Sequence, residues 1–253
     1  MIISNKLSKH KNIIHGFFNK NGGKSKGIYK SLNCGIGSKD HKNKVRQNLQ
    51  IVKKKISKNS KDIFLLNQCH SDKFVFIGKS FKFSKKRIKA DAIITDQKKL
   101  PIAILTADCA PLLLYDHKRN MIAAIHAGWK GALKGIVKKV IDFMLKKGCE
   151  KNYLNVAIGP CINQNNYNVR EDFEKKFIKN NKKNKIFFKK KRNTIFFNLP
   201  KFIKYQLKSI KITNIDAIYI DTFNKKNNFF SARQSIKSKH GDYGRNISII
   251  MIN

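Results

Sequence analysis

The fold class is decided by residues 102–148, IAILTADCAPLLLYDHKRNMIAAIHAGWKGALKGIVKKVIDFMLKKG. Three short apolar runs open this stretch, and their branched and aromatic residues predict strands over 102–105, 112–115 and 121–125. Residues 131–147 then place large apolar side chains at helical spacing, and Gly148 predicts the end of that helix. Short strands followed by an amphipathic helix favour an α/β protein.

The rest of the chain repeats this pattern at uneven intervals. Such irregular alternation favours a mixed-sheet layered sandwich with helices on the outside over a regular doubly wound sheet. No linker-like segment interrupts it, so we expect residues 1–253 to form a single domain. Further strands are predicted at 63–66, 74–77, 92–95, 154–158, 215–220 and 247–252, and further helices at 44–56, 171–180 and 199–210, with a structured loop at 19–40 and a basic loop at 182–192.

The charge of the chain is extreme for its 253 residues. Lys and Arg number 55 against 15 Asp and Glu, which gives a net charge of +40. Lys, Asn and Ile are over-used together along the whole chain, and Arg, the better reader of base edges, is scarce. We therefore interpret the charge as compositional drift that attracts anions loosely, and we expect no specific nucleic-acid partner.

The location of the protein is also an expectation from sequence. No apolar run is long enough to span a bilayer, and the first residues lack the apolar region of a signal peptide. The five cysteines are odd in number and show no paired spacing, which disfavours a disulfide framework. We expect a cytoplasmic protein that does not engage membranes.

Chemically capable residues gather where three predicted strands end. These segments are 68–72, 106–111 and 125–131, and they contribute His70, Cys109 and His126. Two imidazoles and one thiol suit zinc, with copper as the alternative, and three protein ligands leave a position open. Their spacing is unlike that of a zinc finger, so the fold would have to assemble the site.

Other interpretations of the same residues stay open at this level. Cys109 could be a nucleophile activated by a histidine that Asp108 or Asp72 orients. His126 could equally be a buried, hydrogen-bonded histidine, and Cys109 a small core residue. Residue types alone do not separate a metal centre from a cysteine active site.

Candidate substrate contacts are cationic or polar residues near helix starts and turns. Lys130 lies in the turn Gly128-Trp129-Lys130-Gly131, where helix N–H groups and the dipole favour an anion. Arg46 and Asn48 lie near the start of a predicted helix. Arg233 and Arg245 are rare arginines in a lysine-rich chain, and a guanidinium suits planar, bidentate contacts.

Taken in order, these segments resemble the purine nucleoside phosphorylase family long described as laccase-domain or polyphenol-oxidase proteins. The matching stretches run nearly from end to end and include several specific motifs. They are His15-Gly16-Phe17-Phe18, residues 22–29, Ser31-Leu32-Asn33, Val45-Arg46-Gln47-Asn48, Gln68-Cys69-His70, Ala90-Asp91-Ala92, residues 106–111 and 126–131, Gly159-Pro160, residues 229–233, and Gly244-Arg245.

The resemblance implies a zinc ion held by His70, Cys109 and His126, which would also form the catalytic centre. It implies phosphorolysis of adenosine, inosine and related nucleosides, cleavage of methylthioadenosine, and adenosine deamination. Purine nucleoside and phosphate would be the partners, with Arg46, Asn48, Asp108, Lys130 and Arg233 as substrate-binding candidates. Copper-dependent phenol oxidation is the older family assignment and an alternative, as is a cysteine hydrolase; nucleic-acid binding is the non-enzymatic alternative.

The chain departs from the usual family pattern at several positions beside the candidate site. Lys130 stands where an arginine is usual, which keeps the charge but loses the bidentate fork. Cys69 replaces a common valine, and Gln234 stands where a second arginine often follows. None of these changes removes a presumed ligand, so they bear on substrate preference.

Overall fold

A six-stranded mixed sheet forms the centre of the computed structural model, which describes residues 1–84 and 86–253. The three inner pairs, β7 with β5, β5 with β6 and β6 with β3, are antiparallel, whereas β2 and β11 at the two edges pair in parallel with their neighbours. The sheet order is β11-β7-β5-β6-β3-β2, with β2 Phe74–Ile77, β3 Ala92–Thr95, β5 Ala110–Asp116, β6 Met121–Ala127, β7 Leu154–Ile158 and β11 Ile215–Ala217.

A three-stranded antiparallel sheet packs on one face of the central sheet. Its order is β1-β12-β4, with β1 Ile13–Phe17, β4 Ile102–Thr106 and β12 Asn246–Ile252. Tyr115 and Ile122 of the central sheet meet Ile104 and Ile250 of this smaller sheet in one apolar cluster. The two sheets therefore form a sandwich whose interior is mainly apolar.

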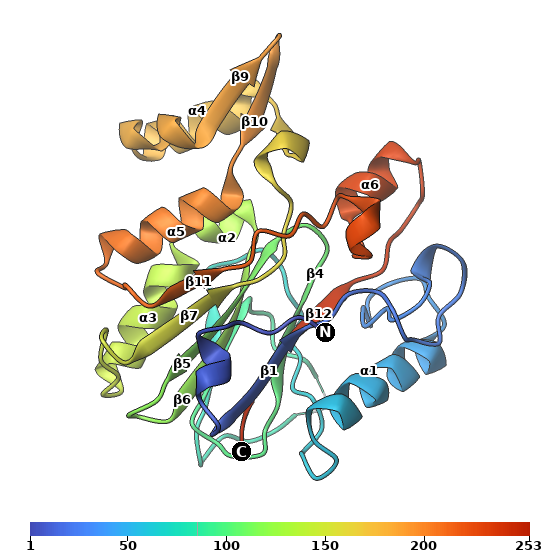
Figure 1. Cartoon of the computed structure of the whole chain (residues 1–253), viewed down its shortest axis with the longest axis vertical. Helices are drawn as coiled ribbons and strands as arrows, with labels where there is room; N and C mark the ends of the chain where they lie inside the picture. Colours follow the sequence, from blue (N-terminus) through green and yellow to red (C-terminus); the bar gives the residue numbers. More distant parts are fainter. Residues whose placement is uncertain (85) are drawn as a thin grey trace.

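Helices cover both outer faces of the sandwich, so the molecule has four layers (Figure 1). Helices α3 and α5 pack on the free face of the central sheet, and α1 packs on the free face of the three-stranded sheet. The mixed α/β sandwich expected from the sequence is confirmed. The helices are α1 Lys42–Ile56, α2 Trp129–Leu133, α3 Ile136–Lys146, α4 Glu171–Asn180, α5 Leu199–Ser209 and α6 Ala232–Lys237, with short 3₁₀ turns η1 Leu7–Lys9, η2 Gly27–Tyr29, η3 Gln164–Asn166, η4 Lys182–Phe187 and η5 Lys225–Asn227.

The predicted helix over 131–147 is broken in the structure. Helix α2 ends at Leu133 and α3 begins at Ile136, because Gly135 between them has a φ of +82°. This left-handed conformation suits glycine and interrupts a continuous helix. Helix α2 therefore begins at Trp129, directly after its N-cap Gly128, and α3 packs its apolar face against the central sheet.

Two other expectations were wrong in part. Residues 63–66 form no strand; Phe64 makes only an isolated parallel bridge to Ile102. The basic loop at 182–192 contains η4 and a strand, β9 Phe188–Lys191, which joins β10 Thr194–Phe197 and the two-residue strand β8 Asn168–Val169 in a small third sheet. In the view of Figure 1 this sheet and α4 stand above the sandwich.

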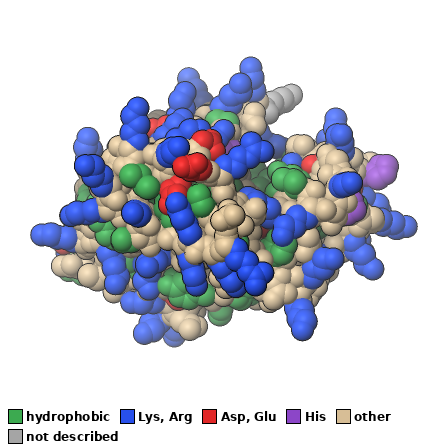
Figure 2. All heavy atoms as spheres, turned by 90° about the horizontal axis from the view of Figure 1, so that it is seen from above, with side chains coloured by type: hydrophobic (Ala, Val, Ile, Leu, Met, Phe, Trp, Pro, Cys, Tyr) green, Lys and Arg blue, Asp and Glu red, His purple; other side chains and the backbone are tan. Residues whose placement is uncertain are grey.

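Basic side chains cover the surface without forming one stripe. Figure 2 shows Lys and Arg spread over the whole of one face, with a few acidic side chains among them. This even distribution fits the interpretation of the charge as compositional drift. Among the described residues, no helix is both long enough and apolar enough to cross a membrane.

A buried histidine on β1 makes stability depend on pH. The Nε2 atom of His15 accepts a hydrogen bond from the Ser4 backbone N–H at 2.8 Å. Burial lowers the pKa of His15 to about 4, so the ring stays neutral in the folded protein at pH values where an unfolded chain binds a proton. Stability is therefore lost as pH falls from about 6.5 towards 4, by about 2 kcal/mol at pH 5.

Lowering the pH from 7 to 5 should reduce the free energy of unfolding of both proteins. We expect the reduction to be smaller in His15→Gln than in the parent chain, by about 2 kcal/mol. Glutamine keeps an acceptor for Ser4 but does not titrate. Urea unfolding at the two pH values measures the difference. Equal losses in both proteins would contradict the assignment to His15.

Candidate metal centre

Two histidines and one cysteine, far apart in the chain, meet at one end of the central sheet. The ligand atoms of His70, Cys109 and His126 all lie within 4.8 Å of one another. The Cys109 Sγ lies 3.8 Å from the His70 Nε2, and the two imidazole rings stand edge to face with centroids 4.8 Å apart. We refer to these three residues as the His–Cys–His cluster.

The central sheet brings two members of the cluster together. His126 lies near the end of β6 and pairs with Pro111 on β5, so the residue just before β5, Cys109, lies beside it. Cys109 ends the tight connection from β4 to β5, in which Asp108 has a φ of +82°. The register of one antiparallel strand pair thus fixes the separation of a thiol and an imidazole.

His70 reaches the cluster from the loop before β2, and Asp91 holds that loop in place. The Asp91 carboxylate is fully buried and accepts hydrogen bonds from the backbone N–H groups of His70 at 3.0 Å and Ser71 at 2.6 Å, and from the Ser71 hydroxyl at 2.7 Å. His70 itself has a φ of +58°. The loop therefore wraps around one carboxylate, and this wrapping turns His70 towards Cys109.

The same carboxylate orients His126. Asp91 Oδ1 lies 2.8 Å from the His126 Nδ1, and the Asp91 backbone carbonyl accepts the His126 N–H at 2.8 Å. Burial acts to raise the pKa of Asp91, but hydrogen bonds from His126 and Ser71 outweigh it and hold that pKa well below its usual range. Asp91 thus stays ionised, and the His126 Nε2 is left for the cluster.

Gly128 provides the space in which the cluster closes. A Cβ atom at this position would lie 2.9 Å from the Cys109 Sγ and 2.9 Å from the His70 Cδ2. Real Cβ contacts are essentially never shorter than 3.0 Å. The glycine in the turn from β6 to α2 is therefore required by close approach, not by an unusual backbone angle.

The half-buried Cys109 thiol and the buried His126 imidazole shift each other's pKa. Burial raises the pKa of Cys109, but the neighbouring His126 charge and hydrogen bonds from both histidines lower it to about 7. Burial lowers the pKa of His126, while Cys109 and Asp91 raise it to about 9. The site is thus poised to hold a thiolate beside a positive charge.

This donor set fits a metal ion. Zinc bonds of about 2.1 Å to nitrogen and 2.3 Å to sulfur place neighbouring tetrahedral ligands about 3.6 Å apart, close to the Cys109–His70 separation. The hydrogen bond that the far nitrogen of His126, Nδ1, donates to Asp91 is the usual support of a ligating histidine. The cluster is therefore compatible with a metal site of three protein ligands.

The cluster opens into a pocket of about 330 Å³, which we call the metal-centre pocket. This volume lies at the lower end of the range for small-molecule sites. Two guanidinium groups, of Arg87 and Arg245, line it together with the Tyr243 side chain. The other lining residues are Gly35, Ile36, Gly37, Leu66, Asn67, Gln68, Leu105 and Ala107, with the three residues of the cluster.

Asp108 lies directly beside Cys109 but turns away from the solvent. Its carboxylate accepts hydrogen bonds from Thr222 Oγ1 at 2.8 Å, Ser231 Oγ at 2.9 Å and the Arg233 backbone N–H at 2.6 Å. Burial raises the pKa of Asp108. These contacts fasten the Cys109 turn to the start of α6.

The other sequence candidates lie outside the metal-centre pocket as the described residues define it. Arg46 is exposed on α1, and Lys130 is exposed on α2 with its Nζ over the Trp129 ring. The Arg233 guanidinium donates to Asn168.

Asn48 is fully buried in α1, where its amide binds the loop containing Ser25 and Ser31. The substrate-binding roles of these sequence candidates stay predictions.

Sequence reasoning missed several residues of the site. Asp91 precedes a correctly predicted strand, yet nothing local indicates that a distant loop folds onto it. Gly128 was noted only as part of a turn. Arg87 lies in a lysine-rich segment, and its being an arginine was the one available signal.

Comparison with known proteins places this chain in a family. The family model described as multi-copper polyphenol oxidoreductase laccase matches residues 14–253. The chain is 35% identical over 190 residues to a purine nucleoside phosphorylase of Rickettsia conorii, covering 74% of this chain and 77% of that protein. A purine nucleoside phosphorylase of Rickettsia prowazekii is 30% identical over 228 residues, 89% and 90% of the two chains.

A solved structure shows the same fold. The crystal structure of the Bacillus licheniformis protein YfiH superposes with a TM-score of 0.87 at 28% identity, covering 95% of this chain and 93% of that one. This chain therefore belongs to the laccase-domain family, whose curated relatives include proteins named purine nucleoside phosphorylase.

The close approach at Gly128 gives a first test of the cluster. We expect Gly128→Ala to weaken metal binding at least about tenfold, because the new methyl group displaces Cys109 or His70 and misplaced ligands bind poorly. Gly37→Ala is the matched control, since Gly37 lines the same pocket but a Cβ there has open space around it. Chelator competition on folded protein measures both; equal affinities would contradict the proposed geometry.

The carboxylate behind the cluster gives a second test. We expect Asp91→Asn to lower metal affinity by about 10–100-fold, because an amide can neither stabilise nor orient His126 as a carboxylate does. Asp96→Asn, which follows the same strand β3 at its far end, is the control and should bind normally. Elemental analysis after dialysis compares the two; metal retention in Asp91→Asn would refute the role of Asp91.

Proposed function

We propose that this protein is a metal-dependent purine nucleoside phosphorylase that uses zinc at His70, Cys109 and His126. The observation that carries the proposal is the cluster itself, which opens into a pocket lined by two arginines. The names of the relatives supply the substrate class, purine nucleoside and phosphate. Adenosine, inosine and methylthioadenosine are the proposed substrates, with residues 1–253 acting as one cytoplasmic domain.

Phosphorolysis demands that one pocket manage two opposite charges. A phosphate oxygen forms a bond to the sugar C1′ while the bond from C1′ to the purine nitrogen breaks. The electron pair leaves with the base, which then takes up a proton. Positive charge develops on the sugar and negative charge on the purine, so a suitable pocket holds phosphate against the sugar and offers donors to the base.

Two arginines of the metal-centre pocket carry the positive charge that a phosphate needs. Arg87 and Arg245 offer planar guanidinium forks for phosphate at one side of the metal-centre pocket. Arg245 is braced by the Tyr243 carbonyl at 2.8 Å and by Asp242, so its direction is fixed. Zinc held by His70, Cys109 and His126 would supply Lewis acidity in the same pocket, and this chemistry also supports deamination of adenosine as a further proposed activity.

The family description as a multi-copper oxidase finds less support in the residues. Within residues 1–84 and 86–253, one group of three or more metal-ligating side chains is found. A single His–Cys–His set does not provide the several sites of a multi-copper centre. Copper therefore stays the less favoured metal.

We expect purified protein, prepared without added metals, to hold about one zinc per chain and to convert inosine and phosphate to hypoxanthine and ribose 1-phosphate. Cys109→Ala should lose at least about 100-fold in kcat/KM, because it removes a ligand and the thiolate charge. Coupled detection of hypoxanthine and elemental analysis on the same preparation check both. Product formation at the level of Cys109→Ala would end the proposal, and stoichiometric copper would favour oxidation.

The pocket arginines separate substrate binding from metal binding. We expect Arg87→Gln to raise the KM for phosphate about tenfold with zinc content unchanged, because one charge-assisted contact to phosphate is lost. Arg46→Gln on α1 tests the sequence-based candidate in parallel. Steady-state kinetics with varied phosphate distinguishes them; an effect at Arg46 alone would move the phosphate site out of the metal-centre pocket.

A cysteine hydrolase is the second candidate, and one observation favours it. Cys109, His126 and Asp91 form a continuous chain of thiol, imidazole and carboxylate, with the pKa of Cys109 lowered to about 7. This order of groups is that of an activated nucleophile. Covalent trapping of Cys109 by an acyl substrate in metal-free protein, with no phosphorolysis by the zinc form, would support it.

A further inference from the structure

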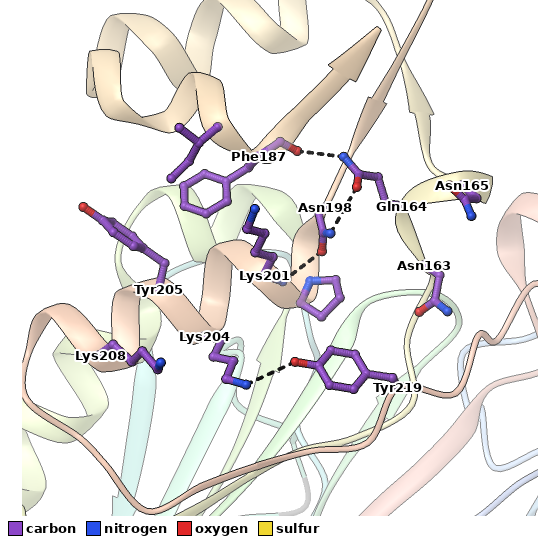
Figure 3. Close-up of a pocket in the computed structure, with 12 residues that line it drawn as sticks. Asn163, Gln164, Asn165, Phe187, Asn198, Lys201, Lys204, Tyr205, Lys208 and Tyr219 are labelled. Atoms are coloured by element: carbon purple, nitrogen blue, oxygen red, sulfur yellow. Dashed lines mark hydrogen bonds between the residues drawn. The ribbon is translucent and has the colours of Figure 1, made fainter. Parts of the chain in front are cut away.

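A second hollow lies on the outer side of α5, and it shares no lining residue with the metal-centre pocket. Its volume is about 630 Å³, larger than the pocket at the cluster. Helix α5 forms its floor, Tyr219 after β11 forms one wall, and η4 with the loop after β7 forms the others (Figure 3). We call this hollow the α5 pocket.

Helix α5 presents a cationic face to this pocket. Phe202, Ile203 and Leu207 of the helix pack in the core, so the opposite face, which carries the lysines, is turned outwards. Lys201, Lys204 and Lys208 follow one another at helical spacing and reach along about 10 Å of the helix axis. We call these three side chains the pocket lysines.

The positive charge of the pocket lysines is not compensated by the protein. Neither an aspartate nor a glutamate lines the pocket, and none of the three is in an ion pair within the described chain. The Lys204 Nζ contacts the Tyr219 hydroxyl at 3.2 Å. On α4, by contrast, Lys175 and Lys176 both have acidic partners one turn away.

Exposed apolar and aromatic surface gathers in the same hollow. Tyr219 is 62% exposed, Ile186 57% and Tyr205 37%, which makes them three of the large apolar side chains that this structure leaves open to solvent. Exposed apolar surface inside a cavity marks binding sites more often than scattered surface residues do. A flat ring could stack on a tyrosine here.

Amide groups add a means of recognising a ring edge. Gln164 and Asn198 hydrogen-bond each other at 3.2 Å, and Gln164 also donates to the Phe187 carbonyl, so both are fixed in the back wall (Figure 3). The side-chain amides of Asn163 and Asn165 also line the pocket. The amides of Asn163 and Asn165 can offer donors and acceptors to a heterocycle.

We propose that the α5 pocket binds a nucleoside di- or triphosphate, with the base against Tyr219 and the amides and the phosphates along the pocket lysines. The juxtaposition of three uncompensated ammonium groups, an exposed aromatic ring and amide side chains in one cavity suits this class of ligand. A chain of phosphates matches lysines spread over two helical turns better than a single carboxylate does. This site goes beyond the proposed phosphorolysis, because it uses none of the cluster residues.

The test is calorimetric titration of the zinc-loaded protein with AMP, ADP, ATP and inorganic triphosphate. We expect affinity to rise from AMP to ATP, with triphosphate at least about tenfold weaker than ATP. Replacing all three pocket lysines by glutamine should weaken ATP binding at least about tenfold. Tyr219→Ala should weaken it about fivefold, because stacking of the base on the ring is lost. Inosine phosphorolysis should be unchanged in these variants.

A matched control separates the pocket from the general charge of the chain. Lys42→Gln, Lys54→Gln and Lys55→Gln together remove the same charge from exposed positions on α1, in the opposite outer layer of the molecule. This variant should change ATP affinity less than about twofold. ATP should also protect the pocket lysines, and not those of α1, from acetylation detected by mass spectrometry.

Equal weakening in the two triple variants would reduce the binding to non-specific attraction and overturn the proposal. Unchanged ATP binding in the α5 variant would do the same by placing ATP elsewhere. Triphosphate binding as tightly as ATP would overturn the role of the base. Because every readout is binding, failure here is distinguishable from failure of the phosphorylase assay.

Discussion

The buried carboxylate of Asp91 is the interaction on which the site depends. It is fully inaccessible to solvent, yet it is ionised because four donors from two segments, the loop at His70 and Ser71 and the strand that carries His126, surround it. A buried charge without such partners would cost several kcal/mol. The loop of His70 and the imidazole of His126 are therefore both held by hydrogen bonds to Asp91, because this buried carboxylate needs donors.

The sandwich positions Cys109, the one member of the cluster that Asp91 does not contact. Cys109 is positioned by the register of β5 against β6 and by the fastening of Asp108 to Thr222 and Ser231. Both strands are completely buried, so a slip of one residue would exchange the side chains that pack against the helices with those that pack against the smaller sheet. The packing energy of the core thus fixes the distance between two ligands that the sequence separates.

Two cavities of different character result from this architecture. The metal-centre pocket lies where strands of the two sheets end, and the cluster, Arg87 and Arg245 all line it. The α5 pocket lies on the outer helical layer, where a helix that buries one face must leave the other open. The high lysine content of the chain makes the second pocket cationic, and no acidic side chain lines the pocket to compensate that charge.

The sequence predicted most strands and helices, because periodicity of apolar residues is a local signal, and its family motifs contain His70, Cys109 and His126, which the structure brings together. It did not reveal the break at Gly135, since glycine is tolerated within helices and only packing decided its left-handed angle. Nor did it reveal the role of Asp91 or the two pockets. These depend on contacts between residues distant in the chain, and such contacts exist only once the core has set the strands in register.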